Sequence, residues 1–507
     1  MATDHLEIER KYDAPESLRL PDLHDLPGVA VVAQPVEHQL EATYYDTADL
    51  RLANQRITMR RRTGGADEGW HLKLPTSDGE REELGRPLGE PDEVPEQLAR
   101  LVRVHVRDRE LAPVARVSNR RVVHRLLDAD RRPLADVSDD HVRAESLGEQ
   151  GGTSAWREIE VELVDGGPEV LDAVGERLKA GGAVPGPSAS KLARALGDRL
   201  ESPRPAAEGG LSPTAPAGEA VRAHLRQQVS QLKEWDPKAR RDEPDAVHKM
   251  RVATRRLRSA LATFRPLLDR TVTEPSRDEL KWLGGVLGAP RDAEVMRERL
   301  RNALDAEPAE LVLGGVARRI DVDLNRRHQK AHNELLRALD GDRYFRLLDA
   351  LDALVADPPF TGGAAQPARD VLPRRVAKTW QRVRERVAEA KAASNPEQRA
   401  RRLHEVRKAA KRARYAAESV ADLFGRPAKR FAKRMENVQE VLGEHQDSFV
   451  LRDQLRQMGV QAHLAGENAF TFGRLHGLEQ ARADRAEGEF APAWRAARRK
   501  KLRRWLQ

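Results

Sequence analysis

Charged side chains alternate with apolar ones along several short stretches of the first 200 residues. Near the N-terminus, HLEIERK places Glu7, Glu9 and Lys11 on one face of an extended chain. The stretch WREIEVEL has one acidic face, formed by Glu158, Glu160 and Glu162. Neighbouring like charges repel each other unless a cation lies between them. These faces therefore predict a divalent metal site, or else an ordinary strand surface that faces solvent.

Basic side chains follow the same alternation between these two acidic stretches. Arg60 and Arg62 alternate in RITMRRR, and Lys73 follows a TGG turn in the next β-rich run, WHLKL. Several strands therefore each have one charged and one apolar face. In a barrel whose apolar face is covered by helices, the charged faces would converge on a polar interior.

Seven ordered runs in residues 3–200, EIERK, YYDT, RRR, WHLKL, DVSDD, EIEVEL and SKLARAL, resemble the CYTH superfamily of triphosphate tunnel enzymes. The resemblance implies an antiparallel eight-stranded β-tunnel in which carboxylates hold Mg²⁺ or Mn²⁺ and basic side chains grip a triphosphate. By position, it implies metal ligands at Glu7, Glu9, Glu158 and Glu160, supported by Glu162 and Asp136. The implied triphosphate contacts are Lys11, Arg60, Arg62, Lys73, Arg121 and Lys191. The implied catalytic residues are Glu7, Glu9, Lys11 and Glu160.

Phosphate chemistry also requires both groups of residues, acidic ones for a metal ion and basic ones for phosphate oxygens. A triphosphate carries about four negative charges, so a site needs guanidinium and ammonium donors for its oxygens. Mg²⁺ prefers oxygen ligands and bridges carboxylate to phosphate, which explains the glutamates in an anion site. The chain departs from the family pattern at Gln55 and Arg56, where a Gly is common, and at His71, where a Thr is common. Neither departure removes a required charge, and inorganic triphosphate is the expected substrate, with thiamine triphosphate or ATP as alternatives.

Composition divides the 507 residues into two parts. Residues 201–218 are dense in Pro, Ala and Gly, as is typical of an exposed linker. Up to residue 200 the chain has 28 Lys and Arg against 38 Asp and Glu, a net charge of −10, and the remainder carries +18. We therefore expect a domain at 1–200, a linker at 201–218 and a helical domain at 219–507.

Cysteine and apolar content limit the cellular setting. The sequence contains no cysteine, so any metal must be bound by carboxylate, imidazole or water. The N-terminus lacks a basic region followed by an apolar run, and no stretch approaches eighteen consecutive apolar residues. We therefore expect a cytoplasmic protein that does not bind membranes.

Two basic amphipathic helices are predicted in the second part. VHKMRVATRRLRSALATF has an apolar stripe of Met250, Ala253, Leu257, Ala260, Leu261 and Phe264. LHEVRKAAKRARYAAESV has a stripe of Val406, Ala409, Ala413, Ala416, Ala417 and Val420. His248 and His404 are 156 residues apart, and VLGAPRDAEV and VLGEHQDSFV carry Asp292 and Asp447 at a spacing of 155. The constant offset indicates a duplicated unit.

The paired helices resemble the CHAD family, over about residues 212–507. That resemblance implies two similar helical bundles, at about 219–360 and 361–507, that bind inorganic polyphosphate. The implied contacts are His248, Lys249, Arg251, Arg255, Arg256, Arg258, His404, Arg407, Lys408, Lys411, Arg412 and Arg414. The expected fold class is α+β multidomain, with a β-tunnel followed by an all-α domain. Glu405 stands where the first repeat has Lys249, which predicts weaker binding by the second repeat unless Lys408, which replaces Val252, compensates.

Three functions of different classes are compatible with the sequence. The first is metal-dependent hydrolysis of inorganic triphosphate or short polyphosphate, with long polyphosphate held by the helical domain. The second is a binding protein with an inactive tunnel that targets the chain to polyphosphate. The third is nucleic-acid binding, which any basic face supports through counterion release. An aromatic content of 4% and the lack of a base-reading motif argue against nucleic acid. The sequence does not fix the oligomeric state.

Overall fold

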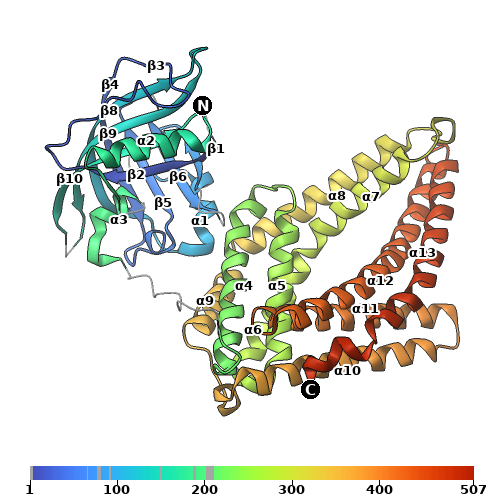
Figure 1. Ribbon diagram of the computed structural model, residues 1–507. Coiled ribbons are helices and arrows are strands. Elements are labelled where there is room, and N and C mark those ends of the chain that lie inside the picture. The colour runs from blue at the N-terminus through green and yellow to red at the C-terminus, as the bar shows by residue number, and fades with distance from the viewer. Residues whose placement is uncertain are drawn as a thin grey trace. The chain divides into compact units, whose positions relative to one another are not determined.

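The chain divides into two compact units, Met1–Arg204 and Pro205–Gln507 (Figure 1). The computed structural model describes residues 4–65, 67–76, 81–90, 93–148, 151–186, 190–200 and 211–507, and for residues 4–7 the backbone alone. An antiparallel sheet domain is followed by an all-helical region, as expected from the sequence. Along the described residues, no helix is both long and apolar enough to span a bilayer.

The described residues of the first unit form an eleven-stranded antiparallel sheet. The strands are β1 (Asp4–Glu7), β2 (Glu9–Asp13), β3 (Val31–Val32), β4 (Val36–Asp46), β5 (Thr58–Thr63), β6 (Gly69–Pro75), β7 (Arg81–Arg86), β8 (Ala112–Leu127), β9 (Pro133–Ser146), β10 (Thr153–Leu163) and β11 (Val184–Pro185). Their order is β1-β7-β6-β5-β4-β8-β9-β10-β2-β11, with β3 paired to β8. The count exceeds the eight expected, partly because β3 and β11 are two-residue strands.

The stretch HLEIERK supplies strands to distant parts of this sheet. β1 pairs with β7, whereas β2 pairs with β10, and only Ile8 separates β1 from β2. Ile8 is 37% exposed, although it lies on the apolar face of the alternating pattern. The reason is geometric: Ile8 lies where the chain leaves one partner strand for another, and its carbonyl accepts a hydrogen bond from the Leu163 backbone N–H.

The apolar faces of the strands are covered by three helices: α1 (Glu96–Val106), α2 (Pro168–Ala180) and α3 (Lys191–Leu196). In β10, Ile159 and Val161 are fully buried in a core shared with Val174 and Leu178 of α2, which crosses the strands in Figure 1. Helix α1 packs on a second core around Trp70 of β6. With the apolar side filled by helices, the glutamates of β10 are directed to the other side of the strand.

The YYDT run ends β4 with a buried turn. Asp46 is fully buried, and its carboxylate accepts hydrogen bonds from the backbone N–H groups of Thr47 (2.7 Å), Leu52 (2.9 Å) and Ala53 (2.8 Å). These contacts fix the loop between β4 and β5. The loop in turn sets the start of β5, which carries Arg60 and Arg62.

We expect Asp46→Ala to lower the free energy of unfolding of the first unit by about 3 kcal/mol, because three buried N–H groups lose their acceptor. Calorimetry of the full chain measures the loss as a shift of one unfolding transition. Asp49→Ala, which removes a half-exposed carboxylate three residues away, is the control and should stay within about 0.5 kcal/mol of wild type. Equal shifts for both variants would contradict the assigned role.

Ten α-helices lie in residues 211–507. They are α4 (Ala217–Arg240), α5 (Ala246–Thr263), α6 (Arg270–Val286), α7 (Gly288–Asp305), α8 (Val316–Leu339), α9 (Asp342–Ala356), α10 (Ala368–Lys391), α11 (Pro396–Glu418), α12 (Ala421–Leu464) and α13 (Phe470–Ala497). A 3₁₀ helix, Lys500–Leu506, ends the chain. Every residue of the two predicted apolar stripes is buried. Those stripes fix which sides of α5 and α11 face the core, and hence which sides carry the basic residues.

Part of the predicted linker belongs to the helical unit. Residues 201–210 lie outside the described residues. Pro216 forms a β-bridge with Pro367, and the carbonyls of Pro213 and Ala215 accept hydrogen bonds from the N–H groups of Arg369 and Ala368. Residues 213, 214 and 216 are exposed, as expected of the linker, but the segment also provides acceptors for the orphan N–H groups at the start of α10.

Candidate functional site

A cavity of about 130 Å³ lies in the first unit, on the charged side of the strands. Strands β2, β4, β5, β6, β7, β8 and β10 and helix α3 contribute to its lining. All six basic residues expected to contact triphosphate line it: Lys11, Arg60, Arg62, Lys73, Arg121 and Lys191. Arg81 adds a seventh cation. The structure thus brings together side chains that are up to 180 residues apart in the sequence.

Strand register brings opposite charges together at this cavity. Glu160 of β10 stands opposite Lys11 of β2, and Arg121 of β8 stands opposite Asp140 of β9. On the other wall, Lys73 of β6 is opposite Glu83 of β7. Directly opposed residues are close enough for side-chain contact, and opposite charges stabilise the pairing. The strand register that assembles the site therefore also places residues of opposite charge next to each other.

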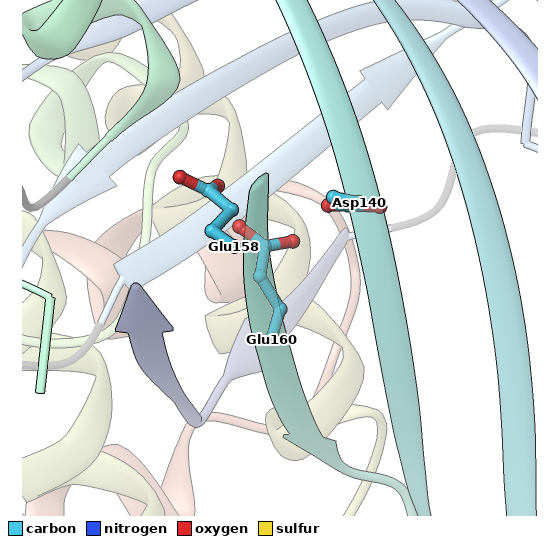
Figure 2. A group of neighbouring side chains, drawn as sticks. All are labelled: Asp140, Glu158 and Glu160. Atoms are coloured by element: carbon cyan, nitrogen blue, oxygen red, sulfur yellow. The ribbon is translucent and has the colours of Figure 1, made fainter. Parts of the chain in front are cut away.

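Three buried carboxylates, Asp140, Glu158 and Glu160, form a cluster that we call the carboxylate triad. Each offers an oxygen within 4.8 Å of the others. Figure 2 shows Glu158 and Glu160 projecting from one strand, β10, and Asp140 from the adjacent β9. An oxygen-only donor set of this charge fits a hard divalent cation such as Mg²⁺ or Mn²⁺. The triad is therefore a candidate metal site by its chemistry.

Three cations compensate the triad. Lys191 Nζ lies 2.8 Å from Asp140, 2.6 Å from Glu158 and 2.7 Å from Glu160. Lys11 Nζ lies 2.5 Å from Glu160, and Arg121 makes two hydrogen bonds of 2.6 and 2.7 Å to Asp140 and a further one to Glu160. Burial alone would raise the pKa of Glu160, but the neighbouring Lys11, Lys191 and Arg121 charges hold that pKa well below its ordinary value.

The start of helix α3 places Lys191 in the cavity. Ser190 is the N-cap, and its Oγ accepts a hydrogen bond from the Ala193 N–H at 3.1 Å. Lys191 is the first residue of the helix, while Leu192 and Leu196 are buried against the sheet. The SKLARAL run therefore folds as a capped helix that anchors by its leucines and directs a lysine to the carboxylates.

The opposite wall centres on Glu83, which the sequence analysis did not select. His71 Nδ1 lies 2.6 Å from its Oε1, Lys73 Nζ lies 3.2 Å from its Oε2, and Arg60 is 3.8 Å away. Burial would raise the pKa of Glu83, but the His71 hydrogen bond and the Lys73 and Arg60 charges hold it far below its ordinary value. Burial lowers the pKa of His71. Glu83 could have been identified from the sequence by pairing the two strands so that it lies opposite Lys73.

The predicted metal ligands fall into three groups. Glu9, Glu160 and Glu162 line the cavity, and Glu158 belongs to the triad. The side chain of Glu7 lies outside the described residues. Asp136 does not line the cavity: it forms a two-point ion pair of 2.7 and 2.8 Å with Arg125.

Asp140, four residues further along β9 and on the same face, belongs to the carboxylate triad instead of Asp136. Both residues lie in the DVSDD run and share one strand parity, so alternation alone could not choose between them. The choice depends on depth, because Asp140 is fully buried whereas Asp136 lies beside the exposed Arg125.

Acid titration tests the Glu83 assignment. A carboxylate with a depressed folded-state pKa contributes stability above its unfolded pKa, about 4.3, and loses that contribution as the pH falls towards the folded value. We expect Glu83→Gln to cost about 2 kcal/mol at pH 7, and the difference from wild type to shrink below about pH 5. Urea unfolding at pH 7, 5 and 3.5 measures it. Glu145→Gln, at an exposed 3.9 Å ion pair, is the control, and a difference that stays constant with pH would contradict the assignment.

In the helical unit, the two basic helices face each other. Arg251 and Arg255 of α5 and Arg407 and Lys411 of α11 form what we call the α5–α11 cation cluster. Burial and the charges of Arg255, Arg407, Arg251 and Arg414 lower the pKa of Lys411 to about 7. Burial and the charge of Arg251 lower the pKa of Arg255 to about 10. Mutual repulsion of this size is typical of a surface suited to a polyanion.

Two of these cations lie beside helical glycines. Arg251 Nη1 is 3.0 Å from Asp292, and a Cβ on Gly288 would approach Arg251 Nη2 to 3.2 Å. In the second half, Arg407 is 3.9 Å from Asp447 and lies in the same way beside Gly443. The repeated VLG segments thus leave room for a guanidinium in both halves. Asp292 and Asp447 therefore each pair with a neighbouring arginine.

Three of the other predicted polyphosphate contacts form ion pairs with glutamates. Arg256 and Arg414 both bind Glu418, at 2.9 and 2.6 Å, and Lys408 binds Glu405 at 2.5 Å.

The remaining predicted contacts are less strongly neutralised. Lys249 Nζ lies 4.2 Å from the Trp235 ring centroid. Burial and then the charge of Arg277 lower the pKa of Arg258. Burial, then the charge of Arg382 and then that of Arg277 lower the pKa of Arg412. His248 is half-buried beside Arg291, whereas His404 lines a separate surface pocket with His445. The twelve residues therefore do not form one uniform surface.

Comparison with known proteins agrees with both units. The CYTH domain model matches residues 5–196, and the CHAD domain model matches residues 223–456. Two proteins of Mycobacterium tuberculosis, Uncharacterized protein MT2285 of strain CDC 1551 and Uncharacterized protein Rv2226 of strain H37Rv, are each 40% identical to this chain over 509 residues. The matches cover 97% of this chain and 96% of each relative. The chain therefore belongs to the family that joins a CYTH domain to a CHAD domain, which confirms both resemblances.

Solved structures also match parts of the chain. PptA from Streptomyces chartreusis is 24% identical, with a TM-score of 0.47, and the match covers 55% of this chain and all of that protein. The CHAD domain from Ricinus communis is 24% identical, also with a TM-score of 0.47, over 59% of this chain and 98% of that domain. A cyclase-related protein from Hippeastrum, whose name reports a dominant triphosphatase activity, is 22% identical with a TM-score of 0.25, over 37% of this chain and 93% of that protein.

Proposed function

We propose that the first unit is a triphosphate tunnel hydrolase that cleaves inorganic triphosphate or short polyphosphate with Mg²⁺ or Mn²⁺. The observation that carries the proposal is the convergence of seven cations and several carboxylates on one small cavity. Membership of the CYTH family supports it. The pairing order of the strands is compatible with an eight-stranded tunnel if β1 and β2, which only Ile8 separates, count as one strand and the two-residue strands β3 and β11 are left out.

The size and lining of the cavity favour an inorganic substrate. Its volume of about 130 Å³ is below the roughly 300 Å³ at which pockets for drug-sized molecules begin. Among its lining residues, Tyr44 and His71 are the ring-bearing side chains, and charged groups form most of the remainder. A nucleoside or thiamine group would need an apolar surface, whereas a triphosphate needs the donors that are present.

Each wall has a separate role in the proposed mechanism. Arg60, Arg62 and Lys73 bind phosphate oxygens and stabilise the charge that develops on the leaving diphosphate. Glu9, Glu160 and the rest of the carboxylate triad hold the divalent cation. When bound, that cation supplies charge neutralisation and lowers the pKa of a coordinated water. The buried walls exclude bulk water, which strengthens each of these interactions.

Phosphate release from tripolyphosphate tests the proposal. We expect wild type to release phosphate only with Mg²⁺ or Mn²⁺, and Glu9→Gln combined with Glu160→Gln to lower kcat/KM by about 100-fold or more. Asp136→Asn is the matched control, because this acid pairs with Arg125 away from the cavity, and it should stay within about threefold of wild type. Metal-independent release, or equal losses in both variants, would contradict the proposal. Wild type that binds polyphosphate without releasing phosphate would instead be a binding protein with an inactive tunnel.

For the helical unit, we propose binding of inorganic polyphosphate at the α5–α11 cation cluster. Four mutually repelling cations lose repulsion when a polyanion lies across them. We also propose that the unit arose by duplication, because α4 and α10 both have 24 residues and each follows a proline of the Pro216–Pro367 bridge. A protein that binds polyphosphate would act where this polymer accumulates, in cytoplasmic granules. Competition between polyphosphate and DNA separates this proposal from nucleic-acid binding.

Lys411 gives polyphosphate binding a pH signature. In the free protein its pKa is about 7, so at pH 8.5 the side chain is mostly neutral. A bound polyanion favours the charged form, so binding takes up a proton and affinity falls as the pH rises above 7, by up to about tenfold per pH unit. Calorimetric titration with long-chain polyphosphate between pH 6.5 and 9 measures this fall. In Lys411→Arg the cation stays charged, so we expect a much smaller fall, and identical profiles would contradict the assignment.

A further inference from the structure

One ammonium group contacts the whole carboxylate triad. Lys191 Nζ lies between 2.6 and 2.8 Å from oxygens of Asp140, Glu158 and Glu160. These are the same three side chains whose oxygens are close enough to share one metal ion. Lys191 is itself buried, as are all three acids. The lysine therefore uses the donor set that the proposed function assigns to a divalent cation.

An ammonium and a divalent cation cannot both use these oxygens. Two cations within one shell of carboxylates repel each other strongly in a buried site of low effective dielectric. The ammonium also donates hydrogen bonds to carboxylate oxygens that a bound cation would coordinate, so the two compete for the triad. Lys11 and Arg121 already supply further positive charge to Glu160, so the triad keeps some compensation if Lys191 leaves.

We propose that Lys191 is an exchangeable counter-ion: a divalent cation displaces its ammonium from the carboxylate triad, and the freed ammonium then binds phosphate in the cavity that it lines. This inference rests on the proposed metal-dependent function of the first unit. The four-carbon side chain allows the movement without any change in α3, which stays anchored by Leu192 and Leu196. Metal binding would thereby prepare the site for triphosphate.

Mn²⁺ binding to the full chain, without any phosphate, tests the exchange. Electron paramagnetic resonance of free Mn²⁺ gives the affinity for wild type, Lys191→Met and Lys73→Met. We expect Lys191→Met to bind Mn²⁺ at least about 10-fold more tightly, because the competing ammonium is gone. Lys73→Met removes the same charge from the opposite wall, where Lys73 contacts Glu83 rather than the triad, and should change the affinity less than threefold.

The outcomes separate the exchange from the function on which it rests. Equal Mn²⁺ affinities for wild type and Lys191→Met would overturn the exchange and leave the metal site intact. Equal gains for the two lysine variants would also overturn it, because a general charge effect would then explain them. No Mn²⁺ binding by any of the proteins would overturn the metal-dependent function together with the exchange.

Chemical labelling of wild type avoids any loss of folding in the variant. An amine-acylating reagent, followed by mass spectrometry of the peptides, reports how accessible Lys191 is with and without Mn²⁺. We expect Mn²⁺ to raise Lys191 labelling at least about threefold, because an ammonium held by three carboxylates reacts slowly, while Lys73 labelling stays unchanged. Unchanged or reduced labelling of Lys191 would overturn the proposal.

Discussion

Compensation of buried charge is the constraint on which the first unit depends. Glu160 lies among Lys11, Arg121 and Lys191, which come from β2, β8 and α3. A buried carboxylate without partners would cost several kcal/mol, so these three elements must meet at this point for the fold to be stable. The same contacts gather the groups that a metal triphosphate requires. The same contacts therefore stabilise the sheet and assemble the site.

In the helical unit, half-buried cations are only partly compensated by acidic residues. Its core is made by apolar stripes on α5 and α11, and packing those stripes brings the two basic faces together. Here the acids are too few to neutralise the cations, and the pKa of Lys411 falls to about 7 as a result of burial and the neighbouring arginines. Hydrophobic packing elsewhere in the unit must outweigh this repulsion. The hydrophobic core holds these cations close together, and a bound polyanion would reduce their mutual repulsion.

Strand and helix periodicity allowed many residues of the charged and apolar faces to be predicted. The predictions failed where burial depth or strand pairing decides the position of a side chain. Alternation selected Glu160 correctly as a residue of the charged face, but it could not distinguish Asp136 from Asp140, which have the same parity and differ in depth. It also puts Ile8 on the apolar face of HLEIERK, although this side chain is exposed where the chain changes partner strands. His71 was noticed as a departure from the family, but its contact with Glu83 depends on the pairing of β6 with β7.

The sequence by itself determined which residues share a face, because side-chain direction in a strand or helix follows from local geometry alone. It therefore determined the charged faces of the strands, the apolar stripes of α5 and α11 and the change of composition near residue 200. Tertiary structure decided which faces meet. The triad needs Asp140 next to Glu158 and Glu160, and Lys191 reaches it only after α3 packs on the sheet. Such contacts join residues far apart in the chain, and their energies depend on burial, which no local pattern records.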